Sequence, residues 1–209
     1  MAVPDSLPQR VFLLAYSPDK GRIRAGGNLG AMLRAAAMAD LYLNGHLTDV
    51  RGRAAVDRRR PCPDPVLEAL LEDIAGSRPR TWQAWVDSRQ RAAVGAVRQQ
   101  LSDGGWVRLE PHRVLGLFPT TRVTLRDHRV RKELLGRVSG ALKKPIGRVD
   151  PADAALVAIV AAGDLTLVLD RKTTRAHKRR IQALTELSGP AGPALRASIR
   201  DTALGGEAG

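Results

Sequence analysis

The chain contains one cysteine, Cys62, and four histidines among 209 residues. A single cysteine excludes an internal disulfide, and a structural zinc site would need more thiol or imidazole ligands than this chain supplies. The longest apolar run, AALVAIVAAG at residues 154–163, lies between Asp153 and Asp164 and falls short of the roughly 18 residues that a spanning helix needs. We therefore expect this run to form a buried helix, and we expect no metal and no cofactor.

Catalytic signatures are also missing. The sequence has no HExxH, no GxSxG and no GxxxxGK[ST], and GGNLG at residues 26–30 lacks the preceding strand and the acidic partner of a dinucleotide site. The carboxylates Glu68, Glu72 and Asp73 fall on one short predicted helix without a histidine, which is typical of a solvated face rather than of an acid/base pair. We expect a protein that is not an enzyme.

The N-terminus has no basic segment ahead of its apolar residues and no clean cleavage site, so the sequence predicts a cytoplasmic protein. What the chain has in excess is positive charge: 34 Lys and Arg against 21 Asp and Glu give a formal net charge of +13. Nucleic acid, an acidic membrane surface and phosphorylated small molecules all fit this charge. The alternative is an arginine-rich, solvated surface that reflects a GC-rich genome.

Apolar residues recur at intervals of three and four, and aromatic residues make up only 3% of the chain, a pattern that predicts a mainly α-helical fold. We expect one domain over residues 1–209, with a β-hairpin near residues 106–125 that turns at Pro111-His112. A second, short hairpin or a loop is expected at residues 46–56. The expected helices span residues 7–16 (capped by Ser6), 27–43 (ended by Asn44-Gly45), 64–76, 80–105 as one or two helices, 128–142, 150–163 and a basic helix at 171–187, followed by a tail.

Two arginine placements are the candidate binding features. Arg34 shares a helix face with Gly27 and Gly30, so an anion could reach both backbone N–H groups and the guanidinium. Arg91 and Arg98 flank Gly95 at helical spacing and leave a gap that a phosphate could fill. The alternative for both is that the small residues let helices pack closely while the arginines point to water.

Several motifs then occur in an order that resembles the Golgi phosphoprotein 3 family. The most specific is HRVLGLFPTTRVTL at residues 112–125, preceded by LSDGGWV. The others are VFLLAY with the DKGR turn, AMLRAAAMADLYLNGHL, PDPVLEALLEDI, RTWQAWVDS, DAALVAIVAAGDL and RAHKRRIQALTE. The resemblance covers nearly the whole chain.

The resemblance implies a compact helical domain around a central helix bundle that binds membranes peripherally. Eukaryotic members recognise phosphatidylinositol 4-phosphate on Golgi membranes and help to retain glycosyltransferases there. The family's pocket arginines match Arg34 and Arg91. The resemblance thus predicts an anionic phospholipid surface as partner, with a membrane-protein client, at the inner face of the membrane.

The sequence departs from the family pattern at two pocket positions. The pocket tryptophan has no counterpart, because this loop offers Arg22, Arg24 and Ala25, and Val94 stands where the family has its third arginine. Arg24 and Arg98 are candidates to replace these groups, since an arginine fork can reach a phosphate from another backbone position. The missing basic N-terminal tail and the GC-biased composition predict a bacterial relative of actinobacterial type, whose headgroup differs from that of the eukaryotic proteins.

Two other functions remain open at this point. The helix and hairpin at residues 90–125 could form a winged-helix DNA-binding element, with Arg108, Arg113 and Arg122 near the wing, although a clear pair of preceding short helices is absent and nucleic acid is the less favoured partner. The third interpretation is a protein-interaction scaffold. For the membrane function, we expect the basic helix at residues 171–187 to face the lipid surface and Phe118 to pack in the core.

Overall fold

The computed structural model describes residues 2–25, 27–57, 61–114 and 118–206, with side chains omitted for residues 112–114, 118–120 and 206. The helices are α1 (Leu7–Leu14), α2 (Leu29–Leu43), α3 (Pro65–Ala75), α4 (Trp82–Asp87), α5 (Gln90–Asp103), α6 (His128–Lys143), α7 (Pro151–Ala162), α8 (Arg171–Ala176), α9 (Lys178–Leu187) and α10 (Ala191–Gly206). Short 3₁₀ turns lie at η1 (Pro18–Lys20) and η2 (Ile146–Arg148). The predicted mainly α fold is confirmed.

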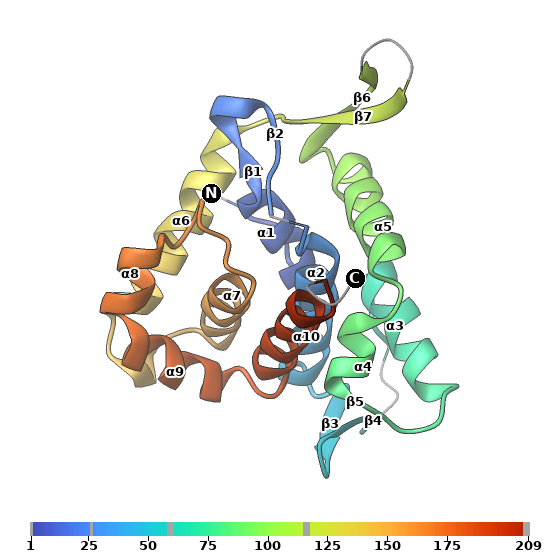
Figure 1. The fold of residues 1–209 in the computed structure, drawn as a ribbon, viewed down its shortest axis with the longest axis vertical. Helices are drawn as coiled ribbons and strands as arrows, with labels where there is room; N and C mark the ends of the chain where they lie inside the picture. Colours follow the sequence, from blue (N-terminus) through green and yellow to red (C-terminus); the bar gives the residue numbers. More distant parts are fainter. Residues whose placement is uncertain (1, 26, 58–60, 115–117, 207–209) are drawn as a thin grey trace.

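Antiparallel strands decorate two ends of the helical body (Figure 1). At one end are the pair β1 (Tyr16–Ser17) and β2 (Arg22–Ile23) and the pair β6 (Val107–Val114) and β7 (Phe118–Leu125). At the other end are β3 (Leu47–Val50), β4 (Arg53–Val56) and β5 (Arg80–Thr81), in the order β3-β4-β5. The expected short hairpin at residues 46–56 is therefore present as β3–β4.

Helix α2 runs through the middle of the helical body and packs against α1, α5, α7 and α10 (Figure 1). Its sequence is rich in alanine, the best helix former, with larger apolar residues such as Met32, Leu33 and Met38 that are almost fully buried. Helix α7 is the run AALVAIVAAG seen in the sequence, and its apolar residues are buried nearly all round, as predicted. Together, α2 and α7 supply much of the core.

Helix boundaries follow the capping residues closely. Asp64 accepts hydrogen bonds from the backbone N–H groups of Val66 (2.9 Å) and Leu67 (3.0 Å) at the start of α3, and α2 ends at Asn44 ahead of Gly45. The predicted cap of α1 was assigned to the wrong side chain. The Ser6 hydroxyl makes no capping bond, and the N–H of Leu7 donates instead to the Asp40 carboxylate on α2, at 2.6 Å.

The turn of the long hairpin differs from the prediction. Pro111 pairs with Thr121 inside the β6–β7 ladder, which runs from Val107↔Leu125 to Val114↔Phe118, so the connection falls at residues 115–117, outside the described residues. A two-stranded ribbon has only edge strands, and an edge strand tolerates proline where its missing N–H would face outward. The Phe118 side chain lies outside the described residues, so its predicted core packing stays a prediction.

The C-terminal region also differs from the prediction. The expected basic helix at residues 171–187 breaks at His177 into α8 and α9, and the expected tail forms α10, which buries Leu195 and Ser198. Arg180 does not extend to solvent: its Nε and Nη2 donate to the carbonyl of Ala141 at 3.0 and 2.6 Å, and Nη2 also donates to the carbonyl of Lys144. A cation at the last carbonyls of α6 stabilises that helix end.

In the part of the chain that the structure describes, no helix combines the length and the apolar character needed to cross a bilayer.

Candidate functional site

Two cavities lie on different sides of α5. The first, called the basic pocket, has a volume of about 470 Å³ and is formed where η1, β2 and β7 meet α2 and α5. It is lined by Phe12, Lys20, Gly21, Arg22, Ile23, Leu29, Val94, Arg98, Thr121, Arg122 and Val123. Four of these residues are cationic, and none is acidic.

The four cations of the basic pocket come from three separate chain segments. Lys20 and Arg22 flank Gly21 in the turn from η1 to β2, Arg98 lies on α5, and Arg122 lies on β7. Gly21 has a positive φ of 57°, and a Cβ added to it would lie 3.4 Å from Nη2 of Arg122, so this guanidinium rests against the turn. The fold therefore brings like charges together across a large sequence separation.

The carboxylates in the described part of the chain do not neutralise this cluster. Within the described ranges, none of the four cations forms an ion pair. Glu110 lies opposite Arg122 in the β6–β7 register, yet its carboxylate approaches Arg108, at 4.0 Å. A concave site that collects unpaired positive charge raises the local concentration of anions and is suited to bind a phosphate group.

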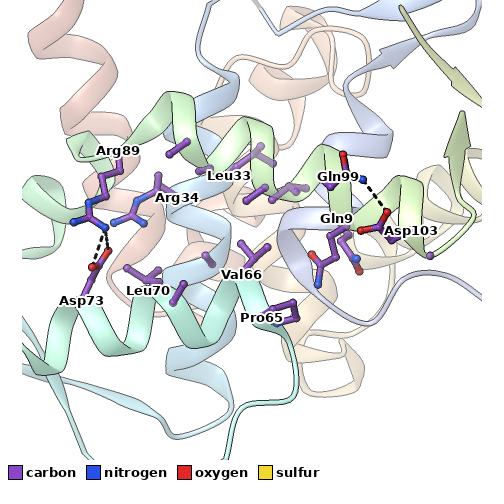
Figure 2. Close-up of a pocket in the computed structure, with 18 residues that line it drawn as sticks. Gln9, Leu33, Arg34, Pro65, Val66, Leu70, Asp73, Arg89, Gln99 and Asp103 are labelled. Atoms are coloured by element: carbon purple, nitrogen blue, oxygen red, sulfur yellow. Dashed lines mark hydrogen bonds and ion pairs between the residues drawn. The ribbon is translucent and has the colours of Figure 1, made fainter. Parts of the chain in front are cut away.

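The second cavity, called the α3–α5 groove, is larger, at about 670 Å³, and mainly apolar (Figure 2). Residues of α2 form its floor, and α3 and α5 form its walls. It is lined by Gln9, Leu33, Arg34, Ala37, Pro65, Val66, Ala69, Leu70, Asp73, Arg89, Ala92, Ala93, Ala96, Val97, Gln99, Gln100, Asp103 and Gly104.

Arg34 lies at one end of the α3–α5 groove and is only 6% exposed. Its Nε donates to the carbonyl of Trp85 at 3.1 Å and its Nη2 to the hydroxyl of Ser88 at 3.0 Å, so it satisfies the C-terminal end of α4. Burial lowers the pKa of Arg34 to about 10, an effect that Asp73 opposes and that Arg89 and Arg80 reinforce. The side chain therefore stays charged at neutral pH.

The structure does not bring the four predicted site residues into one cavity. Arg34 lines the α3–α5 groove and Arg98 lines the basic pocket, whereas Arg24 and Arg91 are exposed and line neither. Arg91 follows Gln90, which packs against Gly30 of α2, and is itself exposed. The roles of the four residues in lipid binding stay predictions.

Gly30, in the first turn of α2, has a packing role. A Cβ on Gly30 would lie 2.6 Å from the Cβ of Gln90, a distance that real Cβ atoms essentially never show, and 3.0 Å from its carbonyl oxygen. Glycine at this position is what lets α2 and α5 touch. The alternative from the sequence, that small residues serve close helix packing, holds for Gly30.

Sequence reasoning missed Lys20, Arg22 and Arg122 as members of one site. The DKGR turn could have indicated that Lys20 and Arg22 project together around Gly21. No local signal indicates that β7 returns to this turn, because the contact of β2 with β7 joins segments about one hundred residues apart in the chain.

A metal site is not evident in the described ranges: no group of three or more His, Cys, Asp or Glu side chains is placed to hold an ion. Cys62 is a free thiol whose pKa is raised by burial.

The fold and these two cavities define a mainly α-helical protein built around α2, with an unneutralised basic pocket beside a two-stranded hairpin. The chain belongs to the Golgi phosphoprotein 3 family: the family model described as Golgi phosphoprotein 3 (GPP34) matches residues 7–202, nearly its full length. No curated protein matches the chain.

Proposed function

We propose that this protein binds the anionic headgroup of a membrane lipid in the basic pocket and so attaches peripherally to the inner face of the membrane. The observation that carries the proposal is the set of four cations, Lys20, Arg22, Arg98 and Arg122, that line one pocket and form no ion pair with the described carboxylates. Phosphate is the preferred group for such a site, because guanidinium forks bind it bidentately.

Family membership supports a lipid headgroup as the source of that phosphate, with phosphatidylinositol 4-phosphate as the reference ligand. The departures at Ala25 and Val94 favour a different or less selective headgroup preference. The site acts by binding, with no catalytic step, and a membrane-protein client would be held at the same surface.

Flotation with vesicles tests the proposal. The three compositions are phosphatidylcholine alone, phosphatidylcholine with phosphatidylglycerol, and phosphatidylcholine with phosphatidylinositol 4-phosphate. We expect binding to both anionic mixtures and not to the neutral vesicles at physiological salt. Equal binding to all three, or stronger retention on duplex DNA than on any vesicle, would overturn the proposal.

Substitutions then locate the site. Arg98→Ala and Arg122→Ala should each weaken binding to anionic vesicles about fivefold, since a basic residue near an anionic surface contributes about 1 kcal/mol. The control is Arg78→Ala, an exposed arginine in the loop before β5, at the opposite end of the helical body, and we expect it to leave binding almost unchanged.

The variant Arg91→Ala distinguishes the basic pocket from the headgroup site that the family resemblance selects. Arg91 matches a headgroup arginine of the family but lines neither cavity. If Arg91→Ala weakens binding more than Arg98→Ala, the headgroup lies on the residues that the alignment selects, and the basic pocket is not the site.

A further inference from the structure

The α3–α5 groove has the features of a second ligand site, independent of the basic pocket. Its lining is mainly apolar: Figure 2 shows Leu33 of the α2 floor and Leu70 of the α3 wall, and Ala93 and Val97 belong to the α5 wall. A cavity of this size with apolar walls and few polar groups is typical of small-molecule sites.

One end of the groove carries a net positive charge. Figure 2 shows the guanidinium groups of Arg34 and Arg89 beside the single carboxylate of Asp73. Both oxygens of Asp73 accept from Nη1 of Arg89, at 3.0 and 2.9 Å, so this carboxylate is already occupied. Arg34 donates only to neutral groups, the Trp85 carbonyl and the Ser88 hydroxyl, among its described contacts. One positive charge is therefore not balanced at this end.

The other end is polar but not basic. Gln9 is only 8% exposed, lines the groove, and its amide has no hydrogen-bond partner among the described residues. Oε1 of Gln100 is likewise buried without a partner, while its Nε2 donates to Asp64 at 2.8 Å. This end therefore offers polar groups and the Asp103 carboxylate, but no cation among its described residues that would hold an acidic head.

The shape of the groove limits what can fill it. The groove follows α5 from Arg89 to Asp103, a rise of roughly 21 Å at about 1.5 Å per residue, so it suits an elongated ligand. An extended peptide would bury its backbone N–H and C=O groups against walls that offer few partners. A hydrocarbon chain has no such groups.

We propose that the α3–α5 groove binds a single-chain anionic amphiphile, with its alkyl chain along the apolar walls and its carboxylate or phosphate head at Arg34 and Arg89. The buried, uncompensated Arg34 sets the position of the head, and the alanines of α5 provide the space for the chain.

Isothermal titration calorimetry with dodecanoate, dodecyl phosphate and dodecanol, each below its aggregation concentration, tests the ligand class. Dodecanoate, dodecyl phosphate or both should bind at least tenfold more tightly than dodecanol, because only these two carry the charge that Arg34 pairs with. Preference for one of the two acids identifies the head. Equal affinity for dodecanol, or no binding of either anion, would overturn the proposal.

A matched pair of substitutions on α5 tests the location. Ala93→Phe places a ring in the groove, and Gly95→Phe places the same ring roughly 200° around the helix, where a Cβ meets no atom within 4 Å. We expect Ala93→Phe to weaken binding of the anionic amphiphile at least tenfold and Gly95→Phe to leave it unchanged. The opposite order would place the ligand elsewhere. Arg98→Ala, which should reduce vesicle binding, should not change amphiphile binding, so the two proposals can fail separately.

Discussion

Helix α5 separates two cavities that handle positive charge in opposite ways. On one side, the basic pocket gathers four cations of which only Arg98 is partly buried. On the other side, the α3–α5 groove holds one deeply buried arginine, Arg34, among mainly apolar walls. Different faces of one helix thus line the two cavities: Val94 and Arg98 line the basic pocket, and Ala93 and Val97 line the α3–α5 groove.

The comparison shows that the buried arginine of the groove contributes to folding, whereas the exposed cations of the basic pocket do not have to. Arg34 loses its hydration and regains hydrogen bonds at the end of α4, so its removal would take away one of the two side-chain donors of the Trp85 carbonyl, the other being the Ser88 hydroxyl. The cations of the basic pocket keep most of their hydration, so folding depends little on them. Stability and vesicle binding should therefore respond to different arginines.

The largest expected effect is on stability at the groove side. Arg34→Ala should lower the free energy of unfolding by about 3 kcal/mol or more, because hydrogen bonds from a charged group are each worth roughly 1.5 to 3 kcal/mol. Arg98→Ala should change it by less than about 0.5 kcal/mol, as is usual for surface substitutions. Urea unfolding of both variants measures the difference. Similar losses in the two variants would mean that the contrast between the cavities is wrong.

The next effect concerns two glycines, Gly30 on α2 and Gly95 on α5, which differ in the space around them. Gly30→Ala should cost about 1–3 kcal/mol, because the new methyl group overlaps Gln90 where α2 meets α5. Gly95→Ala, in open space on α5, should instead stabilise the protein by about 0.5–1 kcal/mol through helix propensity. Thermal unfolding gives both signs. A stabilising Gly30→Ala would show that α2 and α5 are not held at this distance.

The smallest expected effect is a difference in salt dependence. When salt rises from about 0.1 M to about 1 M, the Debye length falls from about 10 Å to about 3 Å, so binding of anionic vesicles at the exposed basic pocket should weaken about tenfold. Binding of dodecanoate at the buried Arg34 should change by less than about threefold, since pairs that involve a buried charge are screened much less than exposed ones. Parallel salt titrations by flotation and calorimetry make the comparison. Equal slopes would indicate that both ligands bind exposed charge.

Most helices could be predicted because their signals are local. Asp64-Pro65 starts α3, Asn44-Gly45 ends α2, and the apolar run between Asp153 and Asp164 forms the buried α7. The hairpin turn could not be placed, because Pro111 is a turn signal unless its strand lies at an edge, and that depends on the tertiary arrangement.

The candidate site was less accessible to sequence reasoning. Helical spacing relates Arg91 to Arg98, but it does not determine which of them meets a neighbouring segment, and the structure places only Arg98 beside the β1–β2 turn and β7. Likewise, nothing in the sequence near Arg34 reveals that its guanidinium reaches Ser88, which is 54 residues away in the chain. Burial and partner choice arise from long-range packing.

The loop before α10 approaches α2 so closely that it limits which substitutions this fold tolerates. Gly189, in the loop before α10, combines a φ of +78° with a position where a Cβ would lie only 2.4 Å from the ring of Tyr42. Two independent reasons therefore exclude a side chain at position 189: the backbone conformation favours glycine, and a Cβ would overlap Tyr42. The tyrosine ring is rigid, so it cannot move aside as the end of a flexible side chain can. In a set of relatives that keep a tyrosine opposite this loop, position 189 should vary less than exposed positions such as Arg78, although it contacts neither cavity.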